Sequence, residues 1–256
     1  MNLHYSSEGL ADFYATQRMS YEDFYPSERW ALELLDLQKT SSILDIGSAC
    51  GGLGKALHDR FGCTEYVGLE IHDKAARIGN EVVASFGGRV LCGDILDAEQ
   101  ILQAAGIAPA FDTVVSFSAL DWNLDVLRNV QSAWSHVKPG GVLVMSLRLH
   151  PRLCLLDLAT SYQSTTPGQA ESDEIAPYVI INLQSAIGEA AALDPECVQV
   201  LGFWGDPSVT AVTPVERIVF CLAVLRKRQE AGPPTQWIVD FPKDVRPEFD
   251  VTLSAL

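Results

Sequence analysis

The stretch ILDIGSACGGLGKAL, residues Ile43 to Leu57, decides the fold class of this chain. It opens with the apolar run of a buried strand, breaks into glycines after Ile46 and then takes on the composition of a helix. A glycine-rich turn between a strand and a helix lets the backbone approach a ligand closely. The stretch therefore predicts the nucleotide-binding turn of an α/β protein, and the question is which nucleotide it holds.

The dinucleotide fingerprint G-x-G-x-x-G is not met in this turn. Counting from Gly47, the third position is Ala49, and counting from Gly51 it is Leu53. A backbone cradle for a pyrophosphate is therefore not predicted. What remains is Asp45 followed by two spaced glycines, a tight turn that does not require a phosphate.

Two acidic residues follow the next two apolar runs of the sequence. Glu70 ends the run YVGLE, and a carboxylate in that place accepts hydrogen bonds from ribose hydroxyls. Asp94 follows the third run and, with Ile95, offers a carboxylate for an exocyclic amine and an apolar face for adenine. Each acid could instead be the N-cap of the next helix. A ribose and an adenine are thus provided for, whereas a phosphate is not.

Short apolar runs alternate with amphipathic runs along most of the chain. Strands are expected at 42–46, 65–69, 89–91, 113–117, 142–146, 197–203 and 217–225. Helices are expected near 53–60, 73–86, 98–105, 123–136 and 181–192. This alternation implies a mostly parallel sheet covered on both faces. The loop before the last strand holds two prolines and no helix, so that strand is predicted to be antiparallel.

In this order, the motifs resemble those of the class I S-adenosylmethionine-dependent methyltransferases. The matching elements are DIGSACGG, GLE, GDIL, FDTVVSFSALDW and VKPGGVLVMSL. The resemblance implies a Rossmann-like, doubly wound sheet of seven strands, mostly parallel with an antiparallel last strand, and S-adenosyl-L-methionine as cofactor. One departure is Ala49, which stands where the family most often has a second glycine and reduces the room near the methionine tail.

The resemblance also implies a set of cofactor-binding residues. Tyr14 and Arg18 are candidates for the methionine carboxylate, because this family often closes its cofactor site with N-terminal helices. The other candidates lie at the turn or at the ends of the second, third and fourth strands: Asp45, Gly47, Ser48, Ala49, Gly51, Glu70, Ile71, Asp94, Ile95 and Ser118.

Residues after the fourth and fifth strands are the candidates for the chemistry, because the ligand crevice of such a sheet lies outside the carboxyl ends of its strands. Asp121 could accept a proton from a hydroxyl or an amine, and the alternative is an N-cap of the following helix. His150 is the histidine expected at the crevice, and the alternative is a surface position before Pro151.

Four further residues are expected to bind the substrate. Arg148 and Arg152 could bind a carboxylate or phosphate, with ion pairs to surface acids as the alternative. Trp122 and Trp204 each follow a strand and could wall an apolar substrate or belong to the core. The expected acceptor is an O or N nucleophile of a small molecule, and an anionic or sugar-like molecule is one possibility.

Composition bounds the remaining possibilities. The chain has 256 residues, 48% of them hydrophobic, which suits one globular domain with a large core. Its net charge of −15 disfavours nucleic acid as a partner. Its apolar runs are too short to span a membrane, it shows no secretory signal, and its six cysteines form no zinc pattern. We therefore expect a cytoplasmic protein without a metal site, as a monomer or homodimer.

The expected organisation is an N-terminal helical cap over 1–40, a methyltransferase domain over 41–228 with an insertion at about 148–178, and a tail over 229–256 that has no clear periodicity. Two alternatives to an active methyltransferase stay open. One is a catalytically silent S-adenosylmethionine-binding scaffold or partner subunit. The other is an NAD-dependent oxidoreductase with an unusual turn.

Overall fold

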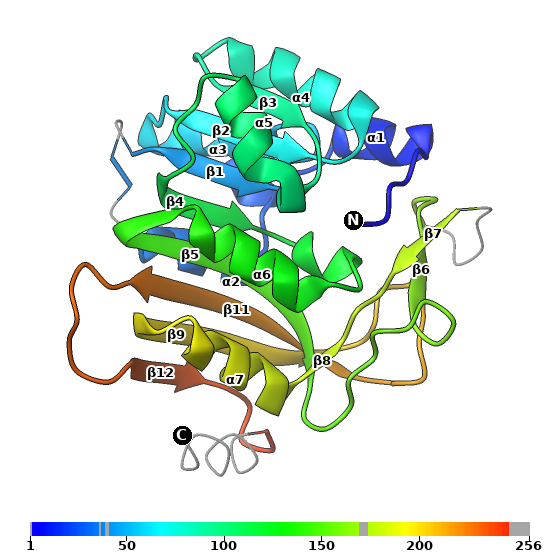
Figure 1. Cartoon of the computed structure of the whole chain (residues 1–256). Helices are drawn as coiled ribbons and strands as arrows, with labels where there is room; N and C mark the ends of the chain where they lie inside the picture. Colours follow the sequence, from blue (N-terminus) through cyan, green and yellow to red (C-terminus); the bar gives the residue numbers. More distant parts are fainter. Residues whose placement is uncertain (1, 36, 39–40, 169–173, 246–256) are drawn as a thin grey trace.

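The computed structural model describes residues 2–35, 37–38, 41–168 and 174–245, and within them helices cover both faces of a central sheet (Figure 1). The strands of this sheet are β1 Ile43–Ile46, β2 Tyr66–Glu70, β3 Arg89–Cys92, β4 Phe111–Ser116, β5 Val137–His150, β8 Ile181–Asn182, β9 Pro195–Gly205, β11 Ile218–Lys227 and β12 Gln236–Asp240. A separate small sheet contains β6 Tyr162–Ser164, β7 Ile175–Pro177 and β10 Ala211–Val212.

The strand order of the central sheet is β12-β9-β11-β5-β4-β1-β2-β3, with β8 paired to β5. The pairs formed by β1, β2, β3, β4 and β5 are parallel, whereas β11 runs antiparallel to both β5 and β9. This confirms the mostly parallel, doubly wound sheet and the antiparallel strand predicted at 217–225, which is β11. Within the described residues, β8 and β12 join the seven strands that the sequence predicts.

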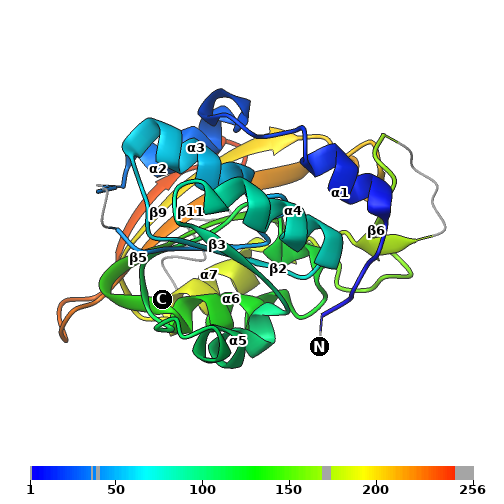
Figure 2. The same cartoon turned by 90° about the horizontal axis from the view of Figure 1, so that it is seen from above.

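The helices lie in two layers on either side of the sheet (Figure 2). They are α1 Glu8–Tyr14, α2 Pro26–Glu33, α3 Gly52–Phe61, α4 Asp73–Ala84, α5 Ala98–Ala104, α6 Val126–Ser135 and α7 Leu183–Ala192, with short 3₁₀ turns η1 Tyr21–Asp23, η2 Ile95–Asp97 and η3 Leu120–Trp122. In the described part of the chain, no helix is long and apolar enough to cross a membrane.

The alternating directions of the β1 side chains explain why helices lie on both faces of the sheet. Leu44 and Ile46 pack in one core with α5, α6 and α7, whereas Ile43 packs in a second core with α2, α3 and α4. Successive side chains of a strand point to opposite faces, so β1, which is buried at every position, needs cover on both sides. The carboxyl ends of β1, β2, β3 and β4 are left together at one edge, where the site forms.

The tail, which the sequence leaves unassigned, joins the sheet through β12 and packs in the core as far as Val245. Its strand β12 pairs in parallel with β9, and Phe241 directly after it is only 4% exposed. A Cβ added at Gly202 of β9 would lie 2.1 Å from the Phe241 ring, so a glycine there leaves the space that the ring fills. The tail up to this point is therefore part of the core.

The variant Phe241→Ala should lower the free energy of unfolding by about 3–5 kcal/mol, because a buried aromatic ring is lost and a cavity remains. Urea unfolding measures this change. Ile238→Ala on the same tail strand, at a residue that is 46% exposed, should change it by no more than about 1 kcal/mol. Equal effects of the two variants would contradict a core role for Phe241.

Candidate active site

The glycine turn between β1 and α3 has the backbone that its sequence predicts. Gly47 has φ +74°, and a Cβ added there would lie 2.2 Å from the Cβ of Ala119, so only glycine fits. Ala49 also has a positive φ, +45°, which is a strained backbone for a residue with a side chain. This strain explains why a second glycine is common at that position. The Ala49 N–H donates a 2.8 Å hydrogen bond to Oε2 of Glu70.

Glu70 lies buried at the carboxyl end of β2, beside the turn. Its Oε1 accepts a 2.8 Å hydrogen bond from the N–H of His72. Burial raises the pKa of Glu70, and the N–H groups of His72 and Ala49 oppose that rise. The N-cap alternative for Glu70 is wrong, because His72 caps α4 by accepting from the N–H of Ala75. Each oxygen of Glu70 keeps a lone pair that a ribose hydroxyl could use.

Asp94 lies at the other end of the site, where it holds the N-terminal segment. Its Oδ2 accepts from the Asn2 N–H at 2.8 Å, and its Oδ1 accepts from Asn2 Nδ2 at 2.7 Å. Oδ1 also accepts from the Leu96 N–H at 3.0 Å. Asp94 is therefore the N-cap of η2, which confirms the N-cap alternative for this residue. A carboxylate has four lone pairs, so Asp94 keeps one for an adenine amine.

One cavity brings these elements together. Its walls are the glycine turn, the ends of β2 and β3, the loop 117–123 after β4, and N-terminal residues from Asn2 to Phe24. Among the predicted cofactor residues, Gly51 does not line it and packs against Gly79 of α4 instead. The predicted residues that do line it are Tyr14, Arg18, Asp45, Gly47, Ser48, Ala49, Glu70, Ile71, Asp94, Ile95 and Ser118, together with Trp122.

The residues of this cavity fit a nucleoside that carries no phosphate. The buried Ser48 hydroxyl, which packs against Gly68 of β2, has no hydrogen-bond partner in the described part of the chain. Asp45, Glu70 and Asp94 all line the cavity, and three carboxyl groups would repel a phosphate while suiting hydroxyl, amine and cationic groups. The cavity therefore has the acceptors that a ribose, an adenine and a positively charged sulfur require.

Arg18, the candidate for the methionine carboxylate, lines the cavity but already has an acidic partner. Its Nη2 lies 2.7 Å from Oε2 of the buried Glu28, and its guanidinium stacks on the Phe24 ring at 4.5 Å. Arg18 also has a positive φ of +58°. The pair and the stacking hold the guanidinium in one place, which suits a binding group that has to be positioned before the ligand arrives.

Asp45 lies beneath the turn and accepts a 2.6 Å hydrogen bond from the Tyr66 hydroxyl. Burial raises the pKa of Asp45 to about 7. The unfolded chain loses this proton near pH 4 and the folded chain near pH 7, so this group makes the protein less stable as pH rises across that range.

The variant Asp45→Asn should therefore be more stable than the wild type at pH 8, by on the order of 4 kcal/mol at most, and no more stable at pH 4. Thermal unfolding across this pH range measures the difference. Asp59→Asn, the same change at an exposed position, should show no such dependence. A constant difference between Asp45→Asn and the wild type at all pH values would contradict the raised pKa.

Some lining residues give no signal in the sequence. The Tyr5 ring lies 5.8 Å from the rings of both His72 and Trp122, which places it in the cavity wall. Nε2 of His72 lies 3.1 Å from the Ser7 carbonyl oxygen and donates to it, because Nδ1 accepts from Ala75. Tyr5 and His72 meet only when the N-terminal segment folds over the sheet, and no spacing rule predicts such a contact.

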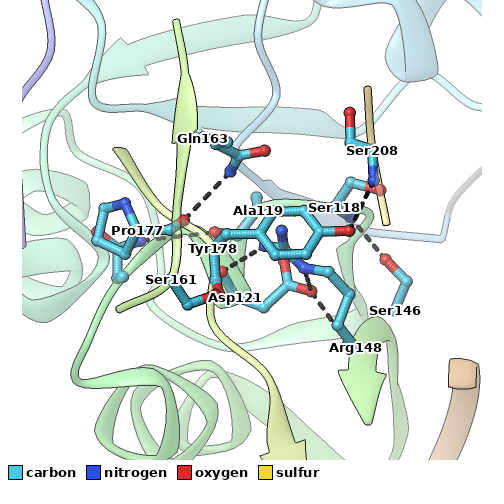
Figure 3. A network of polar contacts seen from close by, with 11 residues as sticks. Ser118, Ala119, Asp121, Ser146, Arg148, Ser161, Gln163, Pro177, Tyr178 and Ser208 are labelled. Carbon is cyan, nitrogen blue, oxygen red and sulfur yellow. Dashed lines mark hydrogen bonds and ion pairs between the residues drawn. The ribbon is translucent and has the colours of Figure 1, made fainter. Parts of the chain in front are cut away.

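Asp121 and Arg148 form a buried ion pair, which corrects the expectation that Arg148 binds the substrate (Figure 3). Oδ2 of Asp121 accepts from Nε of Arg148 at 2.7 Å and from its backbone N–H at 3.1 Å. The Arg148 guanidinium also stacks on the Tyr178 ring at 3.8 Å. Asp121 lies in η3 and Asp125 precedes α6, so the N-cap alternative for Asp121 is also wrong. Neither member of the pair lines the cavity.

Three other predicted residues also lie outside the cavity. Nδ1 of His150 accepts from the backbone N–H groups of Arg152 and Leu153, so it organises the turn after β5. Arg152 is exposed, and no ion pair joins it to an acidic residue in the described part of the chain. Trp204 donates from Nε1 to the carboxylate of Asp244 in the tail, and Arg217 stacks on its ring. The structure does not bring these residues together with the cofactor candidates.

Comparisons with known proteins agree with this geometry. Residues 44–143 match the family described as "Methyltransferase domain". A comparison with curated proteins finds no match. Among solved structures, the chain is similar to Haemonchus contortus phosphoethanolamine N-methyltransferase 2 in complex with S-adenosyl-L-methionine, with 12% identity and a TM-score of 0.59, over 86% of this chain and 57% of that one.

Two further structures share the fold. A chain from the complex that contains the Haloferax volcanii Trm112 methyltransferase activator has 14% identity and a TM-score of 0.56, over 89% of this chain and all of that one. The N-terminal domain of EvdMO1 with S-adenosylhomocysteine bound has 16% identity and a TM-score of 0.55, over 80% and 82% of the two chains. At these identities the likeness concerns the fold.

The sheet order, the motif order around the cavity and the matched domain define a class I methyltransferase that uses S-adenosyl-L-methionine. The chain accordingly contains a methyltransferase domain over residues 44–143.

Proposed function

We propose that this protein transfers the methyl group of S-adenosylmethionine to an O or N nucleophile of a small molecule. The observation that supports this most is that one cavity joins the glycine turn, Glu70 and Asp94 to the loop 117–123 after β4. When bound, the cofactor supplies a methyl group on a positively charged sulfur. The protein then has mainly to align the nucleophile with that carbon and to exclude water.

In this proposal each wall of the cavity has a separate task. Glu70 accepts hydrogen bonds from the ribose hydroxyls, and Asp94 with Ile95 binds the adenine. Arg18 pairs with the methionine carboxylate. Trp122 and the N-terminal residues that line the cavity exclude water from the methyl group.

We do not propose an anionic acceptor, although Arg148 and Arg152 suggest one in the sequence. Arg148 is neutralised by Asp121, and Arg152 is exposed and does not line the cavity. Arg18, which does line it, is assigned to the methionine carboxylate in this proposal. None of these three arginines is therefore left to bind an anionic acceptor.

Calorimetric titration with S-adenosylhomocysteine and with NADH, side by side, tests the cofactor. We expect binding of S-adenosylhomocysteine alone, and tight binding of NADH alone would contradict the proposal. Incubation with methyl-labelled S-adenosylmethionine and fractionated extract, followed by mass spectrometry, then tests the transfer. A protein that binds S-adenosylhomocysteine but labels no metabolite would favour a silent scaffold or partner subunit.

A further inference from the structure

One stretch of the central sheet is left partly uncovered on the face that carries α2, α3 and α4. It consists of Ser146 on β5, Phe220 on β11, and Leu201 and Phe203 on β9, and we call these four residues the open strip. Phe203 is 41% exposed and the other three are half-buried. The strands β5 and β11 each have a neighbour on both sides, and such strands are normally covered on both faces. An uncovered stretch across them therefore needs an explanation.

The pairing register shows that the open strip is continuous. Phe220 lies directly opposite Phe203, and Ser146 and Leu201 both lie opposite Leu222 of β11. Residues that are opposite each other, or two apart on one strand, share a face of the sheet. Because neighbouring strands lie about 4.8 Å apart, the strip reaches about 10 Å from β5 to β9, a distance that a small molecule can span.

The aromatic end of the open strip is held in place. The Phe220 ring packs against the apolar cluster that contains Tyr178, and it fills the space above Gly205, where an added Cβ would lie 2.6 Å from the ring. The Phe203 ring stacks on the Phe220 ring, with 5.7 Å between the centroids and 26° between the planes. A further flat ring can extend such a stack over the exposed part of Phe203.

The other end of the open strip meets the cavity at Ser118. This residue lines the cavity, is exposed, and donates its backbone N–H to Oγ of Ser146 at 2.6 Å (Figure 3). Its φ of +54° is a strained backbone for a residue with a side chain, and such strain is concentrated at functional sites. The open strip therefore begins where the cavity ends.

The order of the strands places this junction on the acceptor side of the cofactor. In the proposed function the adenine lies at the end of β3 and the ribose at the end of β2, and the sheet continues through β1 and β4 to β5, β11 and β9. The sulfur and its methyl group then lie past β2, toward β4. An acceptor has to approach from the strands beyond β4, which are the strands that carry the open strip.

We propose that the open strip binds the methyl acceptor, and that this acceptor contains an uncharged aromatic ring that stacks on Phe203. This inference rests on the proposed function. None of the four residues is charged, and Arg148, the next residue of β5 on this face, is paired with Asp121 and covered by the Tyr178 ring. The Ser146 hydroxyl accepts from Ser118 and keeps its own O–H to donate to a polar group of the acceptor.

The acceptor class is tested by incubation of the wild type with methyl-labelled S-adenosylmethionine and fractionated extract. Mass spectrometry then identifies the product that gains the label. We expect a molecule with an aromatic ring and with the new methyl group on an oxygen or nitrogen outside that ring. A labelled product without an aromatic ring would overturn this inference and leave the proposed function standing.

The place of the acceptor is tested by the variant Phe203→Ala, with the acceptor that the labelling identifies. We expect its KM to rise at least tenfold, because the stacked ring is lost, while kcat and the affinity for S-adenosylhomocysteine stay within twofold. Phe203→Tyr keeps the ring and should leave the KM within threefold of the wild type. Melting temperatures show that both variants are folded.

Ile238→Ala is the matched control, since Ile238 is 46% exposed on the same face of the sheet. It pairs with Gln199, four residues before Phe203 on β9 and away from Ser118, so its KM should equal that of the wild type.

Each other outcome has a separate meaning. An unchanged KM in Phe203→Ala would overturn the inference. An altered molecular mass of this variant in solution, with an unchanged KM, would assign the open strip to a contact between copies of the chain and overturn it as well. A wild-type protein that does not bind S-adenosylhomocysteine, or that labels nothing in the extract, would contradict the proposed function and this inference with it.

Discussion

Replacement of Glu70 by glutamine is expected to weaken S-adenosylhomocysteine binding roughly 100-fold. Hydrogen bonds to a charged group contribute about 1.5–3 kcal/mol each, and two ribose hydroxyls would lose theirs together, so the loss is about 3 kcal/mol. The amide also turns one of two acceptors into a donor, which then faces the N–H of either Ala49 or His72. Calorimetric titration of the variant measures the effect.

The control for this prediction is Glu65→Gln, the same change at an exposed position just before β2. We expect it to bind S-adenosylhomocysteine as the wild type does, because the amino end of a parallel strand lies away from the crevice. Melting temperatures of both variants separate a loss of binding from a loss of folding. An affinity of Glu70→Gln within threefold of the wild type would contradict the ribose role of this carboxylate.

The second large effect concerns stability. Asp121→Ala should lower the free energy of unfolding by about 3–5 kcal/mol, because it leaves the charge of Arg148 buried without its partner. Asp121 is 3% exposed and Arg148 is 5% exposed, so solvent does not compensate for the loss of the partner. The pair also joins η3 to β5, and Tyr178, which stacks on Arg148, extends the contact to residues that follow β7 (Figure 3).

Urea unfolding tests this expectation with two further variants. Asp125→Ala removes an exposed carboxylate four residues away and should change stability by about 1 kcal/mol or less, because the side chain of Asp125 precedes α6 without a capping hydrogen bond. The double variant Asp121→Ala with Arg148→Met removes both charges and should recover part of the loss. If Asp121→Ala alone proves as stable as the wild type within about 1 kcal/mol, the buried pair is not a source of stability.

The class of the fold could be predicted from the sequence because its causes are local. Alternating apolar and amphipathic runs specify strands and helices, and a positive φ restricts the turn to residues such as Gly47. The end of a parallel strand fixes where Glu70 lies relative to that turn. Strand β12 could not be predicted, because the short run QWIVD pairs only when β9 is already present to receive it.

The site divides in the same way. The sequence by itself determined the glycine turn with Glu70 and Asp94, where we propose that the cofactor binds, since each of these residues lies at the end of a predicted strand. Only the tertiary structure decided which of the other candidate residues reach the cavity. It buried Arg148 against Asp121, placed His150 outside the cavity and laid Tyr14 over the turn. Those contacts join segments far apart in the chain, and burial and charge pairing choose among such partners only when the whole chain has packed.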